Sequence, residues 1–218
     1  MNKKDIMAFI SLPDIFSITN GALGFFAIYF ILVGDTLIAA RIVFLCIFLD
    51  SFDGFLARRK NNCADFGKSL DSLSDIISFG IVPSLIFISY QNYNIFAFLA
   101  GVIYVICGLL RLSRFNAMRS EDYFGLPITI GAIFIVLNFL AKIPSFPYSV
   151  LMIITSILFI LDFRLKRPSK NGKSIVIFSI LFLFISLLPY HNFIVVARIL
   201  LIALSSIFLI YLSKGYRS

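Results

Sequence analysis

The stretch that decides the fold runs from Asp50 to Asp75 and reads DSFDGFLARRKNNCADFGKSLDSLSD. Asp50, Asp53, Asp71 and Asp75 recur within it at helical spacing, in a chain of 218 residues that has only 11 Asp and Glu. A carboxylate at the centre of a membrane helix costs roughly 2.5–3.5 kcal/mol on insertion scales. The concentration of acids in this stretch therefore predicts bound cations that compensate for their charge.

The rest of the chain is strongly apolar, as expected for segments that lie in a lipid bilayer. It is 60% hydrophobic with 26 Phe, and its mean hydropathy is +1.00, whereas a soluble domain is nearer half apolar. Eight apolar segments have about the length that a helix needs to cross ~30 Å. They run over 15–33, 36–57, 69–90, 94–113, 125–141, 147–163, 174–190 and 192–213. We therefore predict an all-α, polytopic integral membrane bundle of about eight transmembrane helices. It forms a single domain over 1–218, with a catalytic core at about 12–141 and additional helices at about 147–213.

Basic residues alternate between the connectors of these segments. The N-terminus, residues 58–68, 111–124 and 164–173, and the C-terminal tail hold 16 of the 19 Lys and Arg. By the positive-inside rule these connectors and both termini face the cytoplasm, in a multi-pass protein of the cell membrane. The same distribution explains the net charge of +8 through topology and contact with anionic membrane lipids, so nucleic-acid binding is not expected.

The acids of the opening stretch lie on two helical stripes together with small residues. One stripe follows i, i+3, i+4, i+7, i+8 and holds Asp50, Asp53, Gly54, Ala57 and Arg58; the other follows i, i+4, i+8 and holds Gly67, Asp71 and Asp75. If the two helices return antiparallel, the four acids converge at the cytoplasmic end of the pair. Helix capping and small-residue packing are the alternative explanation, but the register of all eight positions favours a site.

The chemistry of these residues indicates divalent cations. Oxygen ligands without nearby His or Cys favour two Mg²⁺ or Mn²⁺ ions, with Ca²⁺ as an alternative. A zinc site is not expected, because the single histidine, His191, is predicted on the opposite face. Two cations suit a diphosphate, since they stabilise the attacking and the leaving oxygen of a displacement. The small residues on the stripes leave space for a phosphate or a nucleotide.

The pattern Asp50-x2-Asp53-Gly54-x2-Ala57-Arg58-x8-Gly67-x3-Asp71-x3-Asp75 resembles the complete signature of the CDP-alcohol phosphatidyltransferases. The resemblance implies that Asp50, Asp53 and Asp71 hold two divalent cations, and that Asp75 is the general base and also borders a metal. It assigns CDP-lipid contacts to a further set of residues, namely Gly54, Ala57, Arg58, Gly67, Asp14, Ser17 and Asn20. Asp14 and Ser17 depart from the family, which often has Asn and Thr at these two places.

Residues around the signature resemble the phosphatidylserine synthase branch of that family and its archaeal ether-lipid counterpart, the archaetidylserine synthases. The resemblance lies in residues 65–83, 111–116 and 124–127. It implies transfer of a phosphatidyl or archaetidyl group from CDP-diacylglycerol or CDP-archaeol to the hydroxyl of L-serine with release of CMP, by a homodimer. Arg111 and Arg114 are candidates to bind the serine carboxylate, which a guanidinium matches bidentately. Their alternative role is at the basic membrane edge or on lipid headgroups.

Two other functions stay open at this point. One is a transferase of the same family with glycerol phosphate or inositol phosphate as acceptor, because the signature does not specify the alcohol. The other is a cation transporter that uses membrane carboxylates as its pathway. A transporter predicts acids near the midplane on several helices, whereas here they gather on two helices at one face.

Overall fold

The computed structural model describes residues 10–57, 64–118, 123–162 and 164–165, together with isolated positions between 180 and 200. Its helices are α1 (Leu12–Leu32), α2 (Thr36–Ala57), α3 (Ala64–Asp75), α4 (Val82–Tyr90), α5 (Ile95–Ala117), α6 (Ile128–Leu140) and α7 (Ser145–Ile160), with a π-helical turn, η2 (Ile76–Ile81), between α3 and α4. The first six predicted apolar segments are thus confirmed as helical. Most of the last two, and both termini, lie outside the described residues, so the count of eight spans stays a prediction.

Strand structure in the described part is confined to one short pair. β1 (Tyr123–Phe124) pairs antiparallel with β2 (Arg164–Leu165), and close by the backbone N–H of Leu126 donates to the carbonyl of Leu158 at 3.0 Å. The pair joins two of the basic connectors that the sequence places on the same side of the membrane.

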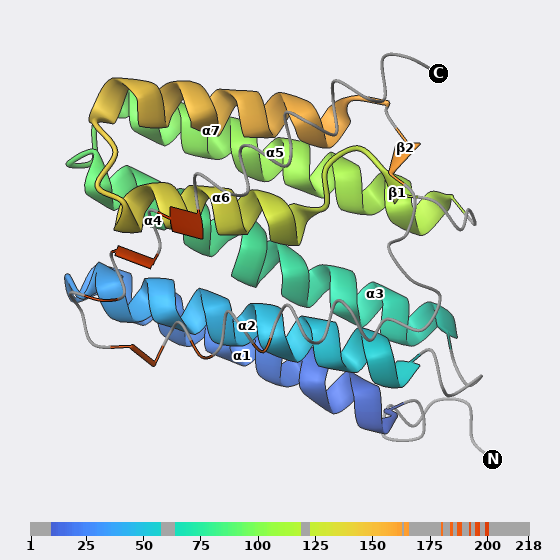
Figure 1. Cartoon of the computed structure of the whole chain (residues 1–218). Coiled ribbons are helices and arrows are strands. Elements are labelled where there is room, and N and C mark those ends of the chain that lie inside the picture. Colours follow the sequence, from blue (N-terminus) through green and yellow to red (C-terminus); the bar gives the residue numbers. More distant parts are fainter. Residues whose placement is uncertain are drawn as a thin grey trace.

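The helices form two groups with α3 and α4 between them (Figure 1). α1 and α2 lie side by side, because a tight turn with Gly34 at φ +89° reverses the chain between them. Ala27, Ala39 and Ala40 are fully buried, and such small residues allow helix backbones to approach closely. α1 also packs against α3, and α5, α6 and α7 form the other group. α1 therefore contacts both helices that carry the motif acids.

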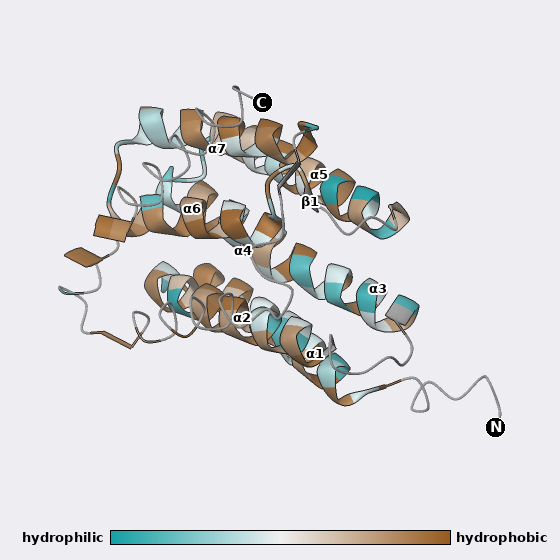
Figure 2. Cartoon of the chain, turned by 45° about the vertical axis from the view of Figure 1, so that its right-hand side comes forward, coloured by the Kyte–Doolittle hydropathy of each residue, from teal (hydrophilic) through white to brown (hydrophobic). Residues whose placement is uncertain are grey.

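Three helical runs are long and apolar enough to cross a membrane: Leu12–Leu32, Asp65–Tyr90 and Ile95–Ala117. α2 has a suitable length, but Arg41, Asp50 and Asp53 lie within it. Large apolar side chains cover the outer faces; Phe25 is 68% exposed and Phe96 77%. In Figure 2 the helices are mainly hydrophobic, whereas α3 carries much of the hydrophilic surface. The described part is a helical membrane protein with its polar residues concentrated at α3.

The helix that carries Asp75 changes its geometry immediately after that residue. Pro83 has no backbone N–H, so the carbonyl of Phe79 lacks its usual α-helical donor four residues on. The hydroxyl of Tyr104 on α5 donates to this carbonyl instead, at 3.2 Å, and both side chains are fully buried. Such π-turns are frequent at functional sites. The wider turn changes the direction of the side chains of Ile76–Ile81 relative to a regular α-helix.

Candidate functional site

Three of the four motif acids come together where α2 passes α3. Asp50, Asp53 and Asp71 each offer one carboxylate oxygen, and these oxygens all lie within 4.8 Å of one another. We call these residues the carboxylate triad. The convergence that the helical stripes predict is confirmed for them, although residues 58–63, which connect the two helices, are outside the described part.

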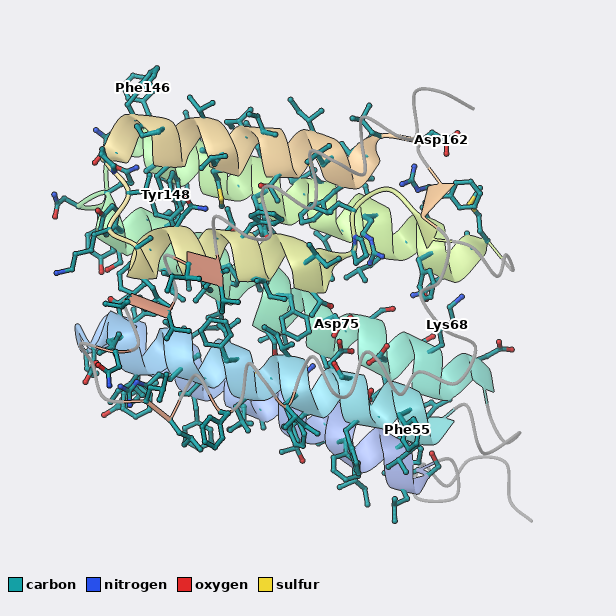
Figure 3. The ribbon with its side chains drawn as sticks, viewed as in Figure 1. Phe55, Lys68, Asp75, Phe146, Tyr148 and Asp162 are labelled. Atoms are coloured by element: carbon teal, nitrogen blue, oxygen red, sulfur yellow. The ribbon has the colours of Figure 1, made fainter. Side chains whose placement is uncertain are left out.

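Asp75 lies one helical turn beyond Asp71 on α3, outside the triad itself. Its side chain is 7% exposed and belongs to the last residue of α3 (Figure 3). The charges of Asp50 and Asp71 repel it, and the charge of Arg111 attracts it. Its Oδ1 atom has no hydrogen-bond partner among the described residues. Asp75 is therefore a buried acid close to the triad with one oxygen available to a ligand.

The triad fits a divalent cation site. Its donors are three carboxylate oxygens with no sulfur or imidazole in the set, which are the ligands that Mg²⁺, Mn²⁺ and Ca²⁺ prefer. The Oδ1 atom of Asp71 is buried and has no partner among the described side chains. Buried like charges at these separations repel one another strongly unless a cation lies between them. The arrangement can thus hold metal and, through it, a phosphate.

α1 forms a wall of the site with three of the residues expected to contact the CDP-lipid. Ser17 Oγ donates to Asp53 Oδ2 at 2.7 Å, which orients one triad carboxylate. Asp14 caps its own helix, because its Oδ2 accepts from the N–H and Oγ of Ser11, both at 2.7 Å. A methyl group built on Gly67 would lie 2.7 Å from Asp14 Oδ1. The space beside Gly67, expected for the nucleotide, therefore holds the Asp14 carboxylate here.

The opposite face of α3 is tied to the end of α5. Lys68 Nζ donates to the carbonyl of Phe115 at 2.7 Å and lies 4.6 Å from the centre of its ring (Figure 3). Ser72 and Asn116 are joined by two side-chain hydrogen bonds: Ser72 Oγ donates to Asn116 Oδ1 at 3.2 Å, and Asn116 Nδ2 donates to Ser72 Oγ at 3.0 Å. These contacts set the rotation of α3 and leave Asp71 on the face toward α1 and α2.

The two candidate arginines of α5 have different surroundings. Arg111 is 6% exposed, and its charge acts on Asp75. Arg114 points to the end of α7, where its guanidinium donates to the carbonyls of Phe124, Phe159 and Ile160 at 3.0–3.1 Å, and more weakly to a fourth carbonyl. This engagement favours a structural role for Arg114.

One contact to the triad comes from a residue that the motif does not include. Thr129, at the start of α6, donates through Oγ1 to Asp50 Oδ2 at 3.4 Å. It lies 79 residues from its partner, and no spacing rule in the sequence links the two. Of the remaining motif positions, Gly54 is half-buried on α2, Ala57 is the last residue of α2, and Arg58 lies outside the described residues.

Comparison with known proteins agrees with this geometry. Residues 10–211 match the CDP-alcohol phosphatidyltransferase family. An archaetidylserine synthase of Methanothermobacter thermautotrophicus is 35% identical over 183 residues, which cover 80% of this chain and 77% of that protein. CDP-diacylglycerol–serine O-phosphatidyltransferases of Methanocaldococcus jannaschii and Bacillus subtilis are 38% and 36% identical, over 59% of this chain in each case and 64% and 75% of theirs. With a match across nearly its whole length and the motif acids gathered at one site, the chain belongs to the CDP-alcohol phosphatidyltransferase family.

Proposed function

We propose that this protein transfers a phosphatidyl or archaetidyl group from a CDP-activated lipid to the hydroxyl of L-serine and releases CMP. The observation that carries the proposal is the position of Asp75, one turn beyond the carboxylate triad and beside Arg111. This position supports Asp75 as the base and the triad as the site that holds the diphosphate through metal. The serine-specific names of the relatives support the choice of acceptor.

Asp50, Asp53 and Asp71 would hold the divalent cations, with Asp75 at their border. We expect two ions, Mg²⁺ or Mn²⁺ with Ca²⁺ as the alternative. When bound, they supply positive charge that neutralises the diphosphate of the CDP-lipid. Ser17 supports this role, since its hydrogen bond orients Asp53 from the second coordination shell.

The chemical step needs a base because a neutral serine hydroxyl is a weak nucleophile. The hydroxyl oxygen attacks the lipid-bearing phosphorus and forms the new P–O bond. The P–O bond to CMP breaks, and CMP leaves with the bonding electron pair. The hydroxyl proton passes to Asp75, whose Oδ1 atom has no competing partner among the described residues.

Arg111 is the residue that we propose for the serine carboxylate. Its burial and its electrostatic interaction with Asp75 support this role. Arg114 is left out, because four backbone carbonyls already surround its guanidinium. For the CDP-lipid we keep the motif residues Gly54, Ala57, Arg58 and Gly67, with Asp14 and Ser17 from α1. Asn20, which the resemblance also assigns to the CDP-lipid, is left out of this set because it lies one helical turn beyond Ser17, the residue of α1 that contacts the triad.

The topology completes the proposal. We expect one membrane domain over 1–218, with its catalytic core at about 12–141, both termini and the triad at the cytoplasmic face, and a homodimeric assembly. The lipid donor is CDP-diacylglycerol or CDP-archaeol, and membrane lipids surround the apolar outer faces.

An acceptor screen tests the function directly. Purified protein in lipid nanodiscs receives CDP-diacylglycerol or CDP-archaeol, Mg²⁺ or Mn²⁺, and one alcohol at a time, and CMP release is followed. We expect release that depends on L-serine and is lost in Asp75→Asn, while CDP-lipid binding persists. Release that depends on glycerol phosphate or inositol phosphate but not on serine would overturn the acceptor assignment. Normal turnover in Asp75→Asn would overturn the base assignment.

A further inference from the structure

The side chain of Asn20, on the inner face of α1, is fully buried and has no hydrogen-bond partner for either polar atom among the described residues. An amide can donate two hydrogen bonds and accept two. Leaving it unpaired in a buried position costs free energy, so a buried amide of this kind calls for a ligand or a structural reason. The backbone of the same residue is well paired, since its carbonyl accepts from Ser78 Oγ at 2.9 Å and Cys46 Sγ lies 3.7 Å away.

These backbone contacts locate Asn20 relative to the base. Ser78 follows Asp75 by three residues, and Cys46 precedes Asp50 by one helical turn. Ser17, one turn earlier on the same face of α1, is bonded to Asp53 of the triad. Asn20 therefore lies one helical turn after Ser17, toward the C-terminus of α1, and at the level of Asp75.

The direction of the side chain points to the same place. Cα–Cβ bonds in an α-helix tilt toward the helix N-terminus, which in α1 is the end nearest the triad. The amide of Asn20 is thus directed along α1 toward the level at which Ser17 contacts the triad. A nucleotide diphosphate is expected on the triad itself, so the ligand at this depth is the group that must reach the base, which is the acceptor alcohol.

We infer that Asn20 binds the ammonium group of the acceptor through Oδ1 and thereby selects an amino alcohol. This inference rests on the proposed function, in which the acceptor is L-serine. The acids around Asn20 create a negative potential that attracts an ammonium and repels a carboxylate, so the carboxylate is directed to Arg111. A neutral amide provides the hydrogen bond without adding a charge that would compete for the divalent cations.

Two substitutions and a matched control test the role of Asn20. Asn20→Leu removes both hydrogen-bonding atoms at similar volume, and Asn20→Ser retains a shorter polar group. Asn138→Leu changes another buried asparagine, on α6, about 13–14 Å along the helix from Thr129. Its Nδ2 donates to the carbonyl of Phe134, and its Oδ1, like that of Asn20, has no partner among the described residues. Serine-dependent CMP release and CDP-lipid binding are measured for each variant that is monodisperse in nanodiscs.

We expect Asn20→Leu to raise the KM for L-serine about 10- to 150-fold, as the loss of one hydrogen bond to a charged group predicts. Asn20→Ser should lie between it and the parent protein, and Asn138→Leu should match the parent. The Kd for CDP-lipid should stay the same in all three. Ethanolamine, which lacks the carboxylate, should lose potency as a competitor of serine in Asn20→Leu, whereas 3-hydroxypropanoate, which lacks the ammonium, should keep it.

The outcomes separate this inference from the proposed function. A parent protein without serine-dependent CMP release overturns the proposed function itself. Serine-dependent release with an unchanged serine KM in both Asn20 variants overturns only the role of Asn20. An increase in the CDP-lipid Kd with no change in serine KM would make Asn20 a nucleotide contact, and equal loss of potency for both competitors would make it a structural residue.

Discussion

Replacing Arg114 by Met removes the guanidinium and keeps the apolar stem, which isolates the contacts at the end of α7. Three of these hydrogen bonds are 3.0–3.1 Å long, to the carbonyls of Phe124, Phe159 and Ile160. The last two carbonyls belong to the final turn of α7, which has no intrahelical donors for them. At roughly 1 kcal/mol net for each bond, plus about 0.3–1 kcal/mol for a cation at a helix C-terminus, we expect a loss of about 3–4 kcal/mol.

The assay is equilibrium unfolding in mixed micelles, with SDS as denaturant and far-ultraviolet circular dichroism as the signal, alongside serine kinetics. Arg114→Met should lose stability and keep its serine KM. Arg111→Met is the matched variant on the same helix, and its serine KM should rise about 10- to 100-fold, since a guanidinium–carboxylate contact is charge-assisted. The reasoning is refuted if Arg114→Met is as stable as the parent, or if its serine KM rises as much as that of Arg111→Met.

Three further predictions follow from single contacts. Ser17→Ala should raise the half-saturating Mn²⁺ concentration about 10-fold or more, because Asp53 loses its orienting donor, and Ser17→Thr should restore it; an unchanged metal titration would contradict this. Tyr104→Phe should lower the unfolding free energy by about 1–3 kcal/mol and reduce kcat, because it leaves a buried carbonyl of the π-turn unpaired; parent-like unfolding would count against it. Gly67→Ala should lower the free energy of unfolding, because its methyl group would lie 2.7 Å from Asp14 Oδ1, and combining it with Asp14→Ala should cost less than the sum of the two separate losses; strictly additive losses would exclude that clash.

Much of the fold could be predicted from the sequence because the bilayer imposes simple rules. A chain in lipid must satisfy its backbone hydrogen bonds within each segment. An apolar segment that is long enough to cross the bilayer is therefore expected to be a helix. The segment predicted at 36–57 coincides with α2, and the one predicted at 94–113 begins at the N-cap of α5, which continues to Ala117. The convergence of Asp50 and Asp53 with Asp71 was predictable for a similar reason, since spacing alone assigns each acid to one face of its helix.

Contacts between helices distant in sequence could not be predicted in this way. Arg111 and Arg114 share a face by spacing, yet Arg111 interacts electrostatically with Asp75 and Arg114 binds the end of α7, because the position of α7 decides what each meets. The sequence predicts open space beside Gly67 because glycine has no side chain. The packing of α1 against α3 places the Asp14 carboxylate in that space.

The sequence by itself determined that this is a helical membrane protein with four acids in register, because helix length and side-chain direction are local properties of the chain. Tertiary structure alone decided three further features: that α1 supplies Ser17 to the triad, that α6 supplies Thr129, and that Tyr104 supports the turn after Asp75. Each of these depends on which helix faces which. That choice is made by the packing of the whole bundle, and no periodicity within one helix encodes it.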